Sequence, residues 1–146
     1  MAQTANQNEQ EELVFNTLTN LRNNLRKLTA KESNTDFLTF IKRVAPTLVT
    51  DWKMGRHIEV IADKLQQVRE GKIKRLMVFL PPRSSKSVIC SKLFPAWYIG
   101  KNPTHEIMSI SHSDQLASDF GRSVRDIVSM HDYQSMFPNV TLRADV

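Results

Sequence analysis

Residues 80–88 read "LPPRSSKSV" and follow a continuous apolar run at residues 76–80. A run of this length suits a central parallel strand that is buried on both faces. The Lys-Ser pair at residues 86–87 usually closes a phosphate-binding loop, which follows such a strand, opens a helix and turns backbone N–H groups and a lysine onto phosphates. The two glycines of the standard pattern, G-x-x-x-x-G-K-[ST], fall on Leu80 and Ser85. The stretch therefore has the context of a phosphate loop without its glycines.

Serine in place of glycine before the lysine costs conformational free energy, which can be compared with the free energy gained from phosphate binding. A left-handed conformation at Ser85 would cost about 1–2 kcal/mol, because the residue has a Cβ atom. Hydrogen bonds to charged phosphate oxygens contribute about 1.5–3 kcal/mol each, and the field of a helix N-terminus adds to them. One strained residue therefore does not abolish such a site.

The stretch supports two interpretations. In the first, Lys86 bridges the outer phosphates of ATP, Ser87 ligates Mg²⁺ through its hydroxyl, and the Ser84 and Ser85 amides contact phosphate oxygens. Arg83 lies over the triphosphate and stabilises charge during γ-phosphoryl transfer. In the second, Arg83 and Lys86 are exposed cations at a turn and the serines cap the helix that follows. The stretch alone leaves both open.

The rest of the chain predicts alternating strands and helices. We expect helices at residues 14–28, 34–44, 56–70, 88–100 and 114–128, with Asn34 and Ser113 as N-caps and with Pro46 and Gly71 ending the second and third. Strands are expected at residues 76–80 and 107–110, and a third begins near Val140. This order predicts an α/β fold with a parallel sheet core preceded by N-terminal helices.

The first of these helices has an apolar stripe. Val14, Leu18, Leu21, Leu25 and Leu28 recur at steps of four and three residues. The stripe covers only two heptads, which is too short to identify a coiled coil. We therefore expect this helix to dock on the body of the protein, with self-association as the alternative.

Composition limits the class of protein. The 146 residues, 40% of them hydrophobic, suffice for one domain plus an appendage. Of the 20 Lys and Arg residues, ten lie in residues 45–100, where there are only four acidic residues. This excess of positive charge favours a partner that carries phosphate, but it also fits a solvated basic face.

Cys90 is the single cysteine, so we expect no disulfide within the chain and no cysteine-based metal site. Neither a membrane span nor a signal peptide is predicted, which indicates an intracellular setting.

Three stretches carry a resemblance to a known family. They are "DWKMGRHIEVIADKLQQVREGKIKRL" at residues 51–76, "LMVFLPPRSSKSVICSKLFPAWYIGKNP" at 76–103 and "IMSISHSDQLASDFGRSVRDIV" at 107–128. Together they resemble the large terminase subunit of tailed bacteriophages, the motor that packages DNA into proheads. The strongest element is P-P-R-x-x-K-S directly after a strand, because this family commonly begins its loop with proline and arginine. Ser85 departs from the family's more usual glycine.

The resemblance implies a P-loop ATPase domain that is joined, in the complete protein, to an RNase H-like nuclease. The sequence pattern predicts a disordered tail at residues 1–8 and a helical segment at 9–45, and the resemblance makes 46–146 an incomplete P-loop ATPase domain without the nuclease. Matching positions make Lys86 and Ser87 the phosphate and Mg²⁺ contacts and Arg83 the γ-phosphate sensor. Trp52 and His57 lie where the family contacts adenine, although both residue types more often serve in packing.

The acidic half of an ATPase site is missing from the pattern. Hydrolysis needs an apolar strand that ends in acids to hold the metal and orient water. None of the acids after the loop meets this requirement, and the nuclease carboxylates are absent too. We therefore expect the chain to be the first part of a terminase that binds ATP-Mg weakly, without sustaining ATP hydrolysis or DNA cleavage.

The resemblance also implies partners. They are double-stranded DNA, the portal protein, the small terminase subunit and, at full length, further copies in a homo-oligomeric ring, in the host cell cytoplasm and without a membrane. A second function remains open, in which the chain is a non-catalytic basic module that holds DNA or a partner subunit.

Overall fold

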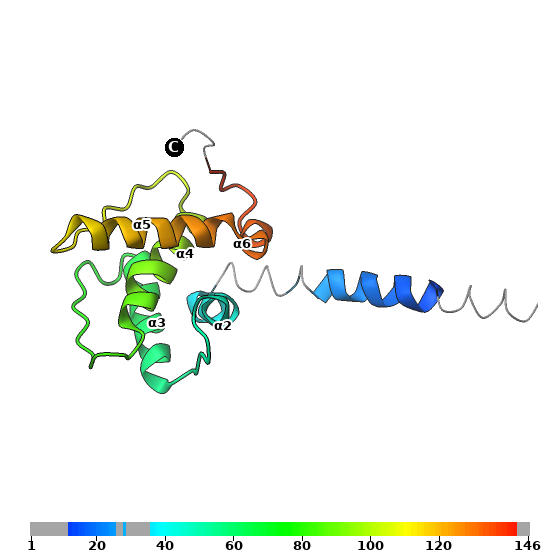
Figure 1. Cartoon of the computed structure of the whole chain (residues 1–146), viewed down its shortest axis with the longest axis horizontal. Helices are drawn as coiled ribbons and strands as arrows, with labels where there is room; N and C mark the ends of the chain where they lie inside the picture. Colours follow the sequence, from blue (N-terminus) through cyan, green and yellow to red (C-terminus); the bar gives the residue numbers. More distant parts are fainter. Residues whose placement is uncertain (1–11, 26–27, 29–35, 143–146) are drawn as a thin grey trace, which may run out of the picture.

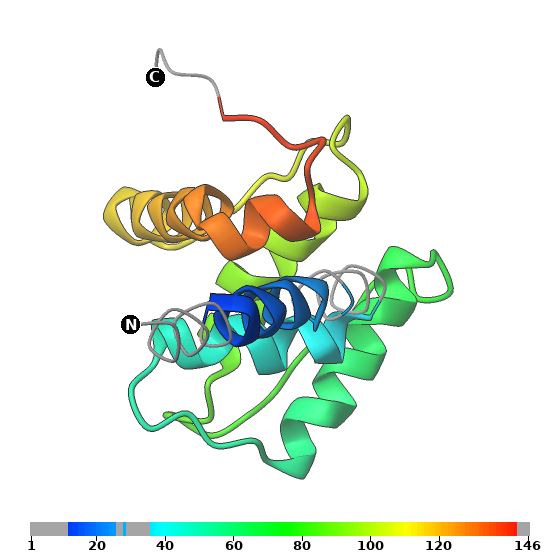
Figure 2. The same ribbon diagram turned by 90° about the vertical axis from the view of Figure 1, so that its right-hand side faces the viewer.

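The computed structural model describes residues 12–25, 28 and 36–142. The predicted disordered tail at residues 1–8 and the predicted cap Asn34 lie outside these residues. A first helix spans residues 12–25. The helices that follow are α2 (Phe37–Leu48), α3 (Arg56–Arg69), the π-helical segment η1 (Val88–Leu93), α4 (Phe94–Lys101), α5 (Asp114–Ser129) and α6 (His131–Met136). Figure 1 shows η1 and α4 between α5 and α6 on one side and α2 and α3 on the other, and Figure 2 shows the same order from the side.

The predicted α/β fold with an incomplete P-loop NTPase-type parallel sheet core is wrong for the part of the chain that the structure describes. Residues 76–80 and 107–110 have no regular secondary structure, so neither forms the expected strand within residues 36–142. We call residues 76–80 the extended segment, because the burial of successive side chains alternates along it. No backbone hydrogen bond joins the amides of residues 76–80 or 107–110 to another described segment. A strand is defined by pairing with a neighbour, and here no neighbour is present in the described residues.

Side chains of the apolar run at residues 76–80 alternate between buried and exposed, which is why the prediction of a fully buried strand was wrong. Leu76, Val78 and Leu80 pack against the core. Met77 and Phe79 point the other way and are 79% and 81% exposed. The run was expected to be buried on both faces, but only one face is covered. The expected strand at residues 107–110 is open as well, since all four of its residues are exposed.

The core is rich in aromatic side chains and gathers around η1 and α4. Phe37 of α2 lies against Trp97 of α4, with ring centroids 5.0 Å apart, and Phe40 lies edge-on to Tyr133 of α6 at 6.2 Å. The Tyr133 hydroxyl donates a 2.8 Å hydrogen bond to the Ala96 carbonyl, and burial holds the pKa of this phenol above its usual value. These contacts tie α2, α4 and α6 into one core.

Helix ends follow local signals with two exceptions. Gly71, at φ 75°, follows α3 as expected, and the Ser113 hydroxyl caps α5 by accepting from the Leu116 amide at 3.4 Å. In α2, the cap is Asp36, whose carboxylate accepts from the Thr39 amide at 2.8 Å. Pro46 was expected to end this helix, but it lies in its last turn, where a missing N–H removes only one hydrogen bond.

None of the helices within the described ranges is long and apolar enough to cross a membrane.

Candidate phosphate-binding loop

The loop that links the extended segment to η1 has an unusual backbone. Arg83 and Ser85 have φ angles of 62° and 59°, in the left-handed region that favours glycine. Each costs about 1–2 kcal/mol relative to an ordinary conformation. Left-handed residues within such a turn direct neighbouring backbone N–H groups into one concavity, the arrangement that binds anions in proteins. The left-handed conformation considered for Ser85 from the sequence is present, and Arg83 shares it.

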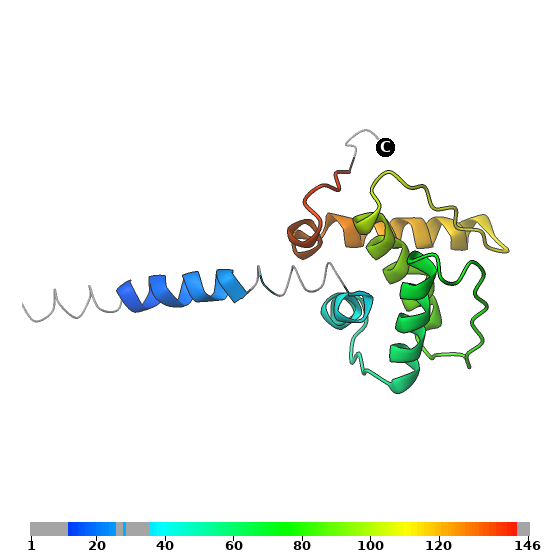
Figure 3. The ribbon, with the colours of Figure 1, turned by 180° about the vertical axis from the view of Figure 1, so that it is seen from behind.

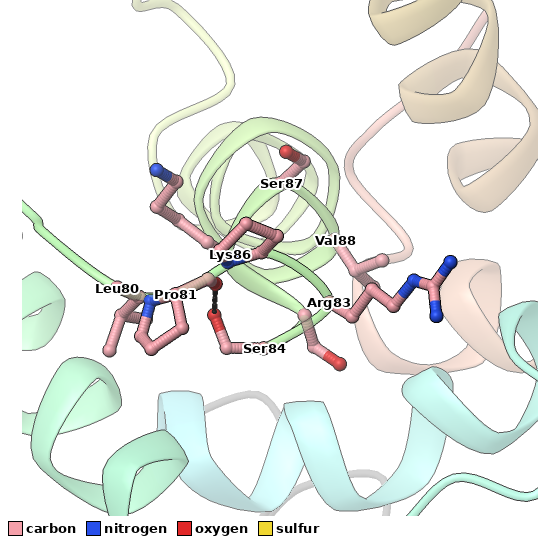
Figure 4. Close-up of a pocket in the computed structure, with 9 residues that line it drawn as sticks. Leu80, Pro81, Arg83, Ser84, Lys86, Ser87 and Val88 are labelled. Atoms are coloured by element: carbon pink, nitrogen blue, oxygen red, sulfur yellow. Dashed lines mark hydrogen bonds between the residues drawn. The ribbon is translucent and has the colours of Figure 1, made fainter.

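A concavity of about 340 Å³ lies over this loop and is lined by residues 80–88. The Ser84 hydroxyl donates a 2.6 Å hydrogen bond to the Pro81 carbonyl, drawn as a dashed line in Figure 4. This bond closes the turn and commits the Ser84 side chain to the loop itself. A ligand in the concavity would therefore meet the Ser84 amide, not its hydroxyl.

The helix that follows starts at the loop. Helical backbone begins at residue 86, and the Ile89 amide makes the first backbone bond, 3.0 Å to the Ser85 carbonyl. The amides of Lys86, Ser87 and Val88 precede that bond and form the electropositive end of the helix. Lys86 and Ser87 are both exposed. Amides, ammonium and hydroxyl are thus available together to an anion.

Arg83 does not join this group. Figure 4 shows its side chain and that of Lys86 directed to opposite sides of the loop. A guanidinium in this orientation lies away from a phosphate held by Lys86. The γ-phosphate role expected for Arg83 would require its side chain to turn.

Trp52 and His57, the predicted adenine contacts, lie outside the concavity. Trp52 is half-buried against the core, and its indole Nε1 is buried without a hydrogen-bond partner among the described residues. His57 is exposed and lines a groove of about 440 Å³ between α3 and residues 76–80. That groove shares only Leu80 with the loop concavity. The structure therefore groups Ser84, Ser85, Lys86 and Ser87, and leaves Trp52 and His57 apart from them.

A second groove on the other side of the loop was not expected from the sequence. Lys86 and Ser87 also line this space of about 400 Å³, together with Cys90, Ser91 and apolar residues of α3 and the extended segment. Burial raises the pKa of the Cys90 thiol, although the nearby Lys86 acts against this shift. The thiol is thus protonated at neutral pH, and Cys90 packs against the core as a partly buried side chain. Cys90 follows Lys86 by four residues, which is one turn of a helix. This spacing could have predicted that Cys90 lies beside Lys86.

Metal ligands are sparse around the loop. Within the described ranges, no three His, Cys, Asp or Glu side chains come together in a way that could hold a metal ion. The Ser87 hydroxyl, predicted from the sequence to bind Mg²⁺, is therefore without such a cluster of protein ligands beside it in the described residues. Mg²⁺ bound here would take its remaining oxygens from nucleotide phosphates and water, which is a common arrangement for this ion.

Ser85→Gly is expected to raise the free energy of unfolding by up to about 1 kcal/mol, because relief of the left-handed strain exceeds the added entropy of glycine in the unfolded chain. Ser84→Gly is the matched control. Ser84 has no positive φ, and its hydroxyl bond to Pro81 would be lost, so this variant should be less stable. Urea unfolding followed by circular dichroism measures both. Equal destabilisation by the two changes would contradict the strain argument.

Comparison with known proteins adds no assignment: no family model, curated protein or solved structure matches the chain. The terminase resemblance thus stays a prediction that rests on the motifs quoted above.

Proposed function

We propose that residues 81–87 bind the phosphates of ATP together with Mg²⁺, and that the chain carries the ATP-binding loop of a phage DNA-packaging motor, the large terminase subunit. The observation that supports this most is the pair of left-handed residues, Arg83 and Ser85, directly before a helix that starts at Lys86. Residues in strained backbone conformations cluster at active sites, ligand clamps and switch regions. A simple helix cap requires no such conformation.

Each part of the loop has a role in this proposal. The amides of residues 84–88 surround the phosphate oxygens, Lys86 bridges the outer phosphates, and Ser87 contributes its hydroxyl to Mg²⁺. η1 begins directly after Ser87. π-Helical segments are often found at functional sites, and a widened first turn spreads the backbone donors that face the ligand.

Hydrolysis is not part of the proposed activity of this chain by itself. An attacking water needs an acidic partner near the γ-phosphate. Among the residues that the structure describes, no aspartate or glutamate lines the loop concavity or either adjoining groove. We expect nucleotide binding without turnover. In the complete motor, ATP would drive translocation of double-stranded DNA in the host cell cytoplasm, by a homo-oligomeric ring with the portal protein and the small terminase subunit.

A competition experiment tests the proposal. A fluorescent ATP analogue with Mg²⁺ is titrated against the protein and then displaced with ATP, ADP, AMP or pyrophosphate. Binding through the phosphates predicts that affinity falls as phosphates are removed and that pyrophosphate alone still competes. Displacement by AMP as efficient as by ATP, or no binding of the analogue, would overturn the phosphate-loop assignment.

A second candidate function rests on the basic residues beside the α3 groove. Arg56, His57 and Lys64 line it within the basic middle of the chain. A non-catalytic module could hold a DNA backbone there. Such binding must weaken steeply as salt concentration rises, because each neutralised phosphate releases counterions. DNA binding that is insensitive to salt would exclude this mode.

A further inference from the structure

The helix of residues 12–25 has an apolar stripe that no described residue covers. Val14, Leu18, Leu21 and Leu25 are 55–59% exposed, and Leu28 at the next step of the pattern is 61% exposed. Figures 1 and 3 show this helix apart from the body formed by α2 to α6. The expectation that it docks on the body is therefore wrong, and its stripe is available to another molecule.

The spacing of the stripe indicates what kind of surface would cover it. A helix that docks on a globular body buries a broad face, about three of every seven positions. Here steps of four, three and four residues give one stripe side chain per turn, and Leu13 and Phe15 widen the apolar surface only in the first turn. A line of this spacing is the seam of two paired helices. A lone helix of about this length is marginal in water, so burial of the stripe is needed to stabilise it.

We propose that the same helix of a second copy of this chain covers the stripe, in antiparallel orientation. Charge complementarity fixes both the partner and the direction. In the sequence, Glu11 and Glu12 come before the first stripe residue, whereas Arg22, Arg26 and Lys27 come in the second half of the stripe. In a parallel pair like charges would adjoin at both ends. In an antiparallel pair the acidic end of each helix meets the basic end of the other.

The antiparallel pairing also fits side chain by side chain. With the helices in register, Val14 of one copy lies opposite Leu25 of the second, and Leu18 lies opposite Leu21. Phe15, 69% exposed beside the seam, then faces Arg22 of the second copy, a pairing that allows a cation–π contact. A parallel pair brings Arg22 next to Thr17 and makes no such contact. The inference uses none of the loop residues and is independent of the proposed nucleotide binding.

Sedimentation equilibrium of the whole chain tests the association. Wild-type protein is expected to shift from monomer to dimer as concentration rises, and a variant with Leu18→Asp and Leu21→Asp to lose the dimer at every concentration. Asn16→Asp with Asn23→Asp is the matched control, because it adds the same charge on the opposite face of the helix and should leave the dimer intact. Both variants change exposed residues, and circular dichroism checks that the body remains folded. A wild-type chain that is monomeric throughout, or a dimer equally stable in both variants, would overturn the proposal.

Disulfide trapping tests the direction. In a Cys90→Ser background, protein with Thr17→Cys is mixed with protein carrying either Asn24→Cys or Arg22→Cys and then oxidised. Antiparallel helices place residue 17 beside residue 24 of the second copy, so the first mixture should cross-link. Parallel helices place residue 17 beside residue 22, and preferential cross-linking in the second mixture would contradict the antiparallel arrangement.

Discussion

Lys86→Ala is expected to weaken the binding of ATP-Mg by about 10–100-fold. A charge-assisted hydrogen bond contributes about 1.5–3 kcal/mol, and each 1.4 kcal/mol corresponds to a tenfold change in affinity. Lys86 is exposed and stands at the first helical position after the strained loop. Its removal should leave the fold unchanged, so the loss of affinity would report on the phosphate contact alone. Titration of the fluorescent ATP analogue measures the effect.

Lys74→Ala provides the matched control for that experiment. Lys74 is an exposed lysine in the turn before residues 76–80 and lines none of the grooves around the loop. Its removal changes net charge by the same amount. At physiological salt, a charge more than about 8 Å from the ligand is largely screened, so affinity should change little. Equal losses in both variants would indicate a general electrostatic attraction, and an unchanged affinity in Lys86→Ala would remove the lysine from the site.

Trp97→Ala is expected to lower the free energy of unfolding by about 3–5 kcal/mol. Trp97 is 0% exposed and lies against Phe37, while the Arg69 guanidinium sits 5.6 Å from its ring centroid. Truncation would leave a cavity between α2 and α4. Since domains of this size have a free energy of unfolding of about 5–15 kcal/mol, the variant should unfold at much lower urea concentration. Circular dichroism in the far ultraviolet follows the transition without relying on tryptophan fluorescence.

Trp97→Phe separates packing from polarity at the same position. The Trp97 Nε1 is buried without a hydrogen-bond partner among the described residues, so replacing indole by phenyl removes an unsatisfied donor. Phenylalanine also keeps a ring between Phe37 and Arg69. We expect a clearly smaller loss than for alanine. A loss as large as that of Trp97→Ala would mean that the cavity argument is wrong.

Local signals in the sequence predicted the longer helices well. Ser113 caps α5 and Gly71 follows α3 because capping depends on the few residues at the helix end. The left-handed conformation of Ser85 could be considered from the loop pattern, since the phosphate-loop motif places a glycine there. Arg83 could not be foreseen in the same way, because no glycine of the pattern falls on it.

Features that depend on distant residues were missed. The run at residues 76–80 has the composition and the alternating burial of a strand, but pairing requires a neighbouring segment that the local pattern does not reveal. α6 (His131–Met136) was overlooked because it is short and is held by the burial of Tyr133 and Met136 rather than by a stripe of its own. The arrangement of the candidate site could not be predicted for a similar reason. The orientation of Arg83 away from Lys86 depends on backbone geometry and not on the spacing of the two residues in the sequence.

The extended segment at residues 76–80 also bears on how the protein behaves at high concentration. Its outer face is apolar, and its amides make no backbone hydrogen bond to another described segment. These are the features through which strands of separate molecules join and aggregate. Charges and prolines at the flanks of such a segment oppose that process. Here the flanks are Lys72, Lys74 and Arg75 before it and Pro81 and Pro82 after it. Pro81 and Pro82 at the start of the loop are therefore expected to oppose aggregation through this segment as well.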